Sequence, residues 1–132
     1  TFWEPFVDRG FSPDSGATWL LPRLIGVARA RRMLLLGEKV AGSTAAEWGL
    51  IHQSVPPGGL AEAAEKLLGQ LASGPTVALG LAKRALANSQ HATLGQSMAH
   101  ELSDLELSAR SADFKEGLAA FRDRRTPDFQ GR

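Results

Sequence analysis

The sequence predicts a mainly α-helical chain. From residue 60 onward, apolar side chains recur at helical spacing, as at Leu60, Ala64, Leu67 and Leu71, and glycine or proline separates the stretches. Only residues 50–55 alternate weakly between apolar and polar side chains, as a half-buried strand does. Helices that follow a single strand do not make an independent α/β sheet. We therefore expect the helical end of something larger, or one protomer of an oligomer.

The N-terminal part is expected to be rich in turns. Residues 1–12 combine apolar side chains at near-helical spacing with a proline and a glycine, which favours a buried segment with one helical turn. Residues 12–16 have the composition of a tight turn. Asp14 or Ser15 is then the expected N-cap of a short helix, which contains a proline and ends at Gly26.

Polar caps and glycine stops predict the other helices. Ser43 or Thr44 is expected to begin a short helix, with Glu47 completing a capping box. Thr93 and Ser111 are expected to begin the last two helices. The expected helical stretches are residues 27–36, 43–48, 60–71, 75–85, 94–109 and 111–121.

Composition narrows the function classes. The chain has 132 residues and a net charge of +1, so no strong field attracts nucleic acid or an anionic membrane. No apolar run is long enough to span a bilayer. The absence of cysteine excludes disulfides and thiol nucleophiles and fits a reducing compartment, which leads us to expect a cytoplasmic protein. The aromatic-rich start at Thr1, without an initiating Met, suggests a piece of a longer chain.

The common catalytic and nucleotide-binding motifs are missing. No glycine-rich fingerprint of a dinucleotide or phosphate loop occurs. Residues 10–14 begin like the turn that carries a nucleophilic serine, but Asp14 stands where its second glycine belongs, so we reject a serine hydrolase. The histidines are scattered without ligand spacing, and we expect no metal site.

Asp14 is the first candidate for chemistry, and two interpretations remain open from the residues alone. It is either a helix cap or a general base or nucleophile that faces an apolar pocket built from Phe6, Phe11 and Trp19. The arginine clusters at residues 29–32 and 122–125 are likewise either solvated helix faces or contacts for an anionic ligand.

Three stretches together resemble a known family. The stretches are residues 10–16 with 21–26, residues 46–51, and the tail with Ser111, Asp113, Glu116 and Arg124. The order and spacing of these stretches are similar to those of the enoyl-CoA hydratase/isomerase (crotonase) family. The Pro-Asp-Ser-Gly turn is most similar to the branch that contains epoxyphenylacetyl-CoA isomerases. The resemblance covers the C-terminal half of the family.

The resemblance implies a fold and a division of the chain. Family members form an α/β spiral of ββα turns followed by a helical trimerisation region. Residues 1–73 would be the end of that core, and residues 74–132 the helical region for oligomerisation and CoA contact. The backbone amides that hold the thioester oxygen in the family lie in the absent half. We therefore expect this chain to be inactive alone.

The resemblance also assigns roles to single residues. Phe6 stands where hydratases carry a glutamate, which argues against water addition and leaves it as a substrate contact beside Pro13. Asp14 matches the aspartate that moves a proton in the isomerases of the family and acts as nucleophile in its chlorobenzoyl-CoA dehalogenase. The resemblance therefore makes a catalytic Asp14 the favoured interpretation. Arg124 falls near the CoA 3′-phosphate. Leu105 and Phe121 flank the adenine or acyl portion.

The expected function is thus proton transfer on an enoyl-CoA thioester. The expected partners are an acyl-CoA substrate and further copies in a trimer or dimer of trimers, with no nucleic acid, membrane or metal. Coenzyme A is part of the substrate, so no separate cofactor is expected. Two alternatives stay open: an enoyl-CoA hydratase whose acid and base lie in the missing half, and a non-catalytic trimerising fragment.

Overall fold

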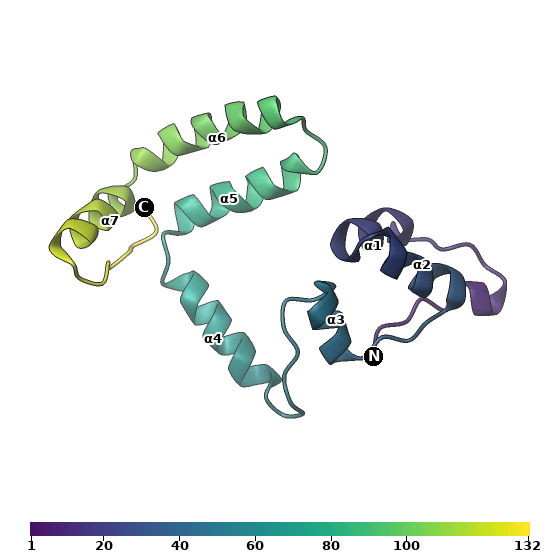
Figure 1. The fold of residues 1–132 in the computed structure, drawn as a ribbon. Coiled ribbons are helices and arrows are strands. Elements are labelled where there is room, and N and C mark those ends of the chain that lie inside the picture. Colours follow the sequence, from purple (N-terminus) through teal and green to yellow (C-terminus); the bar gives the residue numbers. More distant parts are fainter. The chain divides into compact units, whose positions relative to one another are not determined.

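A computed structural model describes residues 1–132 and shows two compact units (Figure 1). The N-terminal unit, Thr1–Leu60, holds the 3-10 turn η1 (Val7–Arg9) and helices α1 (Ala17–Ile25), α2 (Val27–Leu36) and α3 (Gly42–Trp48). The C-terminal unit, Ala61–Arg132, holds α5 (Thr76–Ser89), α6 (Leu94–Ala109) and α7 (Ala112–Asp123), and α4 (Leu60–Ala72) begins at the boundary. The prediction of a mainly helical chain is confirmed.

The N-terminal unit has a small apolar core between α1 and α2. Gly26 separates the two helices with φ +79°, a value that favours glycine, and its N–H donates to the Pro22 carbonyl at 3.0 Å. The tight turn lets the apolar faces of both helices pack together. The buried core residues are Leu21, Ile25, Ala30, Met33, Leu34, Val40 and Ala45.

The strand expected at residues 50–55 is wrong. The N–H groups of Leu50 and Ile51 donate to the Ala45 carbonyl at 2.9 and 3.4 Å, in the turn that follows α3. Both side chains pack against the core as part of that turn. The chain forms no sheet, and its one β feature is an isolated antiparallel bridge between Phe2 and Val40. The weak alternation therefore reflects packing on a helix end.

Two of the four expected caps are wrong, and both lie in the N-terminal unit. The residue before α1 is Gly16, and neither Asp14 nor Ser15 caps the helix. Helix α3 follows Ala41 without a side-chain cap, so Ser43 and Thr44 lie inside it.

The caps expected in the C-terminal unit are confirmed. The Thr93 hydroxyl accepts the Gln96 N–H, and the Gln96 side chain accepts the Thr93 N–H at 2.9 Å, which completes a capping box at α6. The Ser111 hydroxyl accepts the Phe114 N–H at 3.0 Å and begins α7.

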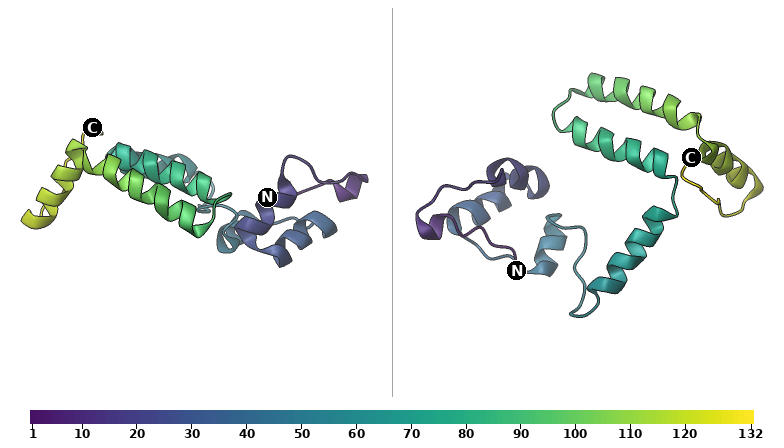
Figure 2. Two further views of the ribbon diagram at one scale, coloured as in Figure 1. Left: turned by 90° about the horizontal axis from the view of Figure 1, so that it is seen from above. Right: turned by 180° about the vertical axis from the view of Figure 1, so that it is seen from behind.

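Helices α5 and α6 lie antiparallel and side by side in the C-terminal unit (Figures 1 and 2). The small residues Ala78, Ala82 and Ala85 of α5 face α6, and Arg84 pairs with Asp104 across the two helices at 2.6 Å. None of α4, α5 and α6 buries a side chain fully. No helix of the chain is both long and apolar enough to cross a membrane.

Candidate functional site

A hollow of about 410 Å³ brings the first sequence candidates together in the N-terminal unit. Phe6 and Asp14 both line it, as the sequence predicts. Pro13 is half-buried between two lining residues and does not itself line the hollow. The complete lining is Pro5, Phe6, Arg9, Phe11, Ser12 and Asp14.

Backbone turns build this hollow from nearby residues. Gly10 ends η1 in the left-handed region at φ +74°, and its N–H donates to the Val7 carbonyl at 3.1 Å. The Phe11 N–H then donates to the Phe6 carbonyl at 2.9 Å, so the two phenylalanines stay close in space. Ser15 and Gly16, at φ +53° and +79°, reverse the chain again before α1 begins.

This second reversal frees the Asp14 side chain from helix capping. The Asp14 carbonyl accepts the Ala17 N–H at 2.9 Å, so the backbone performs the turn. The Asp14 carboxylate accepts a hydrogen bond from the neighbouring Ser15 hydroxyl at 2.8 Å. An exposed carboxylate near the start of a helix and beside apolar side chains can accept a proton or attack an electrophile.

The structure adds Arg9 to the site and removes Trp19. Sequence reasoning did not select Arg9, although it lines the hollow; the only available signal was its position between Phe6 and Phe11. Its guanidinium lies 5.9 Å from the centroid of the Trp3 ring. Trp19, expected as a pocket wall, is instead covered by the Arg23 guanidinium at 3.8 Å and does not line the hollow.

The other predicted residues lie in the C-terminal unit. Leu105 of α6 is 60% exposed and lines a shallow hollow against α5. Phe121 of α7 is 87% exposed. Arg124 follows α7 directly and adopts the left-handed conformation at φ +54° and ψ +41°. All three side chains can therefore contact a ligand or another chain.

The tail after Arg124 is held along α7 by two carboxylates. Asp113, only 3% exposed, accepts the Gln130 and Gly131 N–H groups at 2.7 and 2.8 Å. Glu116, one turn later, accepts the Asp128 N–H at 2.8 Å and both Arg125 Nη atoms at 2.6 and 2.9 Å.

These bonds shift the protonation of the Glu116–Arg125 pair. The hydrogen bonds from the Arg125 side chain and the Asp128 backbone lower the pKa of Glu116 to about 2. The same carboxylate raises the pKa of Arg125. The pair therefore stays charged throughout the neutral range.

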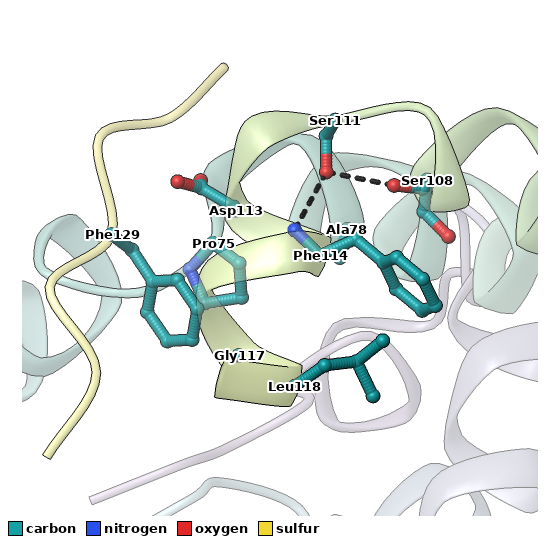
Figure 3. Close-up of a pocket in the computed structure, with 9 residues that line it drawn as sticks. All are labelled: Pro75, Ala78, Ser108, Ser111, Asp113, Phe114, Gly117, Leu118 and Phe129. Atoms are coloured by element: carbon teal, nitrogen blue, oxygen red, sulfur yellow. Dashed lines mark hydrogen bonds between the residues drawn. The ribbon is translucent and has the colours of Figure 1, made fainter. Parts of the chain in front are cut away.

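A second apolar hollow, of about 230 Å³, lies beside the tail (Figure 3). Phe129 of the tail faces Gly117, where its ring would lie 3.5 Å from an added Cβ. Ser111 also lines the hollow, but its hydroxyl donates to the Ser108 carbonyl at 2.7 Å and is already engaged. Ser108 and Asp113 line it as well, and their side chains are also engaged, with the Leu105 carbonyl and with the tail N–H groups respectively. No group of His, Asp and Glu side chains in the chain could hold a metal ion.

Comparison with known families decides the classification. The model of the family described as enoyl-CoA hydratase/isomerase matches residues 1–132, the whole chain. The chain belongs to this family. The resemblance of the Pro-Asp-Ser-Gly turn and the tail motif is therefore confirmed at the level of the family.

Two curated relatives from Escherichia coli strain K12 illustrate the range of this family. The chain is 42% identical over 131 residues to 1,2-epoxyphenylacetyl-CoA isomerase, and the match covers 99% of this chain and 50% of the relative. It is 36% identical over 131 residues to 2,3-dehydroadipyl-CoA hydratase, and the match covers 99% of this chain and 51% of that relative. The chain thus spans about half the length of the curated relatives it matches.

A solved structure supports the same fold. The crystal structure of enoyl-CoA hydratase from Bacillus anthracis is 34% identical, with a TM-score of 0.87, over 96% of this chain and 49% of that chain. The helices described above are therefore a portion of the crotonase fold.

Proposed function

We propose that this chain, together with the part of the family fold that it does not span, acts on acyl-CoA thioesters by moving a proton on an enoyl group. The observation that supports this most is that Asp14 lines a hollow together with Phe6 and Phe11, while its side chain is not used as a helix cap. The 42% identity to a CoA-thioester isomerase agrees with it. A cytoplasmic location is part of the same proposal.

In the proposed reaction, Asp14 takes a proton from the carbon next to the double bond. The electron pair of that C–H bond moves toward the thioester, whose oxygen becomes an enolate oxygen stabilised by backbone amides outside this chain. Asp14, now a carboxylic acid, returns the proton to a different carbon, and the double bond moves. No oxidant or further reactant is needed.

The other candidate residues bind the substrate in this proposal. Phe6 and Pro13 shape the acyl site of the N-terminal unit, in which residues 1–73 form the end of the family core. Residues 74–132 provide oligomer contacts and hold CoA, where Leu105 and Phe121 contact the adenine or acyl portion and Arg124 contacts the 3′-phosphate. Because Leu105, Phe121 and Arg124 are exposed, a ligand or a neighbouring protomer can reach them.

The decisive experiment replaces Asp14 by asparagine in a preparation that contains the complete fold. Loss of a positioned acid–base group typically costs about 10²–10⁴-fold in rate, so isomerisation of an enoyl-CoA should fall by at least about a hundredfold. Asp8→Asn is the matched control, because Asp8 lies in the same unit but does not line the hollow. Wild-type activity of the Asp14→Asn enzyme would refute the proposal.

Hydration of an enoyl-CoA is the second candidate, since the chain is also 36% identical to a hydratase. Phe6 at the hollow supplies no acid or base, so hydration would need carboxylates from outside this chain. Both reactions should be measured on one preparation. Hydration that greatly exceeds isomerisation and survives Asp14→Asn would favour this alternative.

A non-catalytic role in assembly is the third candidate. Helices α4 to α6 bury no side chain fully, and Leu94, Leu102 and Phe121 remain largely exposed, which favours self-association as a trimer or dimer of trimers. Sedimentation would give the oligomeric state. We expect no turnover of an acyl-CoA by the chain alone, and rapid turnover would show that the remaining half of the fold is not needed.

A further inference from the structure

The three arginines at the end of α7 differ in their partners. Arg122 pairs with Asp123 at 2.9 Å, and Arg125 makes a two-point bond with Glu116 at 2.6 and 2.9 Å. Arg124, between them, has no carboxylate partner. Its guanidinium is therefore the one in this cluster that remains available for an external anion.

The backbone of Arg124 is unusual for a residue with a side chain. Its φ of +54° lies in the left-handed region, where a Cβ crowds the backbone and glycine is the common choice after a helix. Strained positions of this kind persist where surrounding contacts hold them, and they are frequent at functional sites. The contacts that hold Arg124 are thus part of the explanation of its role.

Glu116 supplies the side-chain part of this support. The N–H groups of Arg124 and Arg125 donate to the last carbonyls of α7, those of Phe121 and Ala120, at 3.3 and 3.0 Å. Glu116 then fixes the Arg125 guanidinium, and it also accepts the Asp128 N–H at 2.8 Å. The chain is consequently fixed immediately after Arg124 and again four residues later.

We propose that Glu116 is a positioning residue for Arg124. By engaging Arg125 and the Asp128 amide, it holds the left-handed turn that directs the Arg124 guanidinium toward a phosphate of the bound thioester. It also neutralises Arg125, so the anion meets one directed cation instead of two mobile ones. The identity of the phosphate rests on the proposed function, whereas the control of the turn does not.

Positioning and net charge predict opposite effects of one substitution. Glu116→Gln removes a negative charge and breaks the ion pair and the two-point bond with Arg125, so a cluster that acts only by charge would bind phosphate more tightly. If Glu116 acts by positioning, the same change weakens phosphate binding although the local charge becomes more positive. Asp123→Asn is the matched control, because it frees Arg122 and adds the same charge, while the Asp123 side chain bonds to Arg122 and makes no hydrogen bond to Arg125 or Asp128.

The first measurement reads the turn itself, by NMR on the whole chain. A residue at φ +54° has a short distance between its own N–H and Hα protons and a correspondingly strong NOE. This NOE should be strong at Arg124 in the wild type and in Asp123→Asn, and it should weaken in Glu116→Gln. An unchanged NOE in Glu116→Gln would overturn the proposal whether or not CoA binds.

The second measurement compares coenzyme A with 3′-dephospho-coenzyme A by calorimetry. One charge-assisted bond to a phosphate is expected to favour coenzyme A about tenfold in the wild type, and Arg124→Met should abolish this preference while Arg124→Lys keeps part of it. Glu116→Gln should lose most of the preference, and Asp123→Asn should keep it. A preference that rises in Glu116→Gln would overturn the positioning role. Equal binding of both ligands by a wild type with the expected NOE would instead overturn the proposed 3′-phosphate contact.

Discussion

Asp113 offers the sharpest test of how the C-terminal tail is held. It is the one buried charged residue of the chain, and its carboxylate accepts the Gln130 and Gly131 N–H groups at 2.7 and 2.8 Å. Its own N–H donates to the Arg132 carbonyl at 3.0 Å, and any substitution except proline keeps this donor. Asp113→Ala should therefore release residues 130 and 131 while it leaves α7 intact.

The geometry gives the size of the effect. A hydrogen bond to a charged group contributes about 1.5–3 kcal/mol, and the released N–H groups can reach water, so the lower end applies to each. Two bonds then contribute about 3 kcal/mol, which corresponds to a little more than a hundredfold in the local opening equilibrium. Asp113→Asn keeps one acceptor oxygen and should have an effect of about tenfold.

Amide hydrogen exchange measures this opening directly. Exchange at Gln130 and Gly131 should accelerate about a hundredfold in Asp113→Ala. The Asp128 amide is an internal control because its acceptor is Glu116, and Asp123→Ala is the matched control on the exposed side of the same helix. If exchange at both tail amides stays within about twofold of wild type, the carboxylate does not hold the tail.

Three further predictions concern pH, the core and a cap. Arg125 lowers the pKa of Glu116 from 4.5 to about 2. The ionised Glu116 should therefore contribute fully to the free energy of unfolding above about pH 4.5, and this contribution should be lost as the pH falls through about 2. A carboxyl ¹³C titration of Glu116 with a midpoint near 4.5 would contradict this. Met33 is 1% exposed, so Met33→Ala should lower the free energy of unfolding by about 2–5 kcal/mol, as measured by urea unfolding. A decrease below about 1 kcal/mol would contradict the place of Met33 in the core. Thr93→Ala should cost about 1 kcal/mol and increase amide exchange in the first turn of α6, whereas an unchanged first turn would show that the capping box with Gln96 contributes nothing.

Helix positions in the C-terminal unit could be predicted because local signals agree there. Thr93 precedes an apolar stripe and has Gln96 three residues later, and Ser111 precedes another stripe. Both hydroxyls accept the N–H that the capping rules predict. What covers the stripes could not be predicted, because a period of 3.6 residues identifies an apolar face without identifying its partner.

Predictions failed where a backbone turn or a neighbouring side chain, which hydrophobic periodicity does not encode, decides the structure. Residues 50–55 alternate weakly, but a strand needs a second strand, and Leu50 instead bonds back to Ala45 and packs on the core. Proximity in the sequence predicts Trp19 as a pocket wall, but Arg23, one turn later, covers its ring. Arg9 could not be selected because its place at the hollow depends on two successive chain reversals.

The failed cap at α1 is informative about the candidate site. A Pro-Asp-Ser-Gly sequence normally uses its acid to satisfy the first N–H groups of a helix, and here α1 begins without any side-chain cap. The chain instead places Ser15 in the left-handed region at φ +53°, a conformation that costs an L-residue about 1–2 kcal/mol. An uncapped helix and a left-handed Ser15 are each locally unfavourable, and together they leave the Asp14 side chain at the hollow without a role in helix capping.

A left-handed non-glycine residue at or beside a candidate site residue occurs once more in the chain. Its only non-glycine residues with positive φ are Ser15 and Arg124. The first adjoins Asp14, and the second is the arginine within residues 122–125 that has no carboxylate partner. Natural sequences agree with local preferences in most places and depart from them where function requires it. The sequence and its family resemblance point to Asp14 and Arg124 without reference to the backbone, and the dihedral angles of Ser15 and Arg124 are a separate observation. That two independent criteria select the same two turns is the strongest structural reason to test Asp14 and Arg124 first.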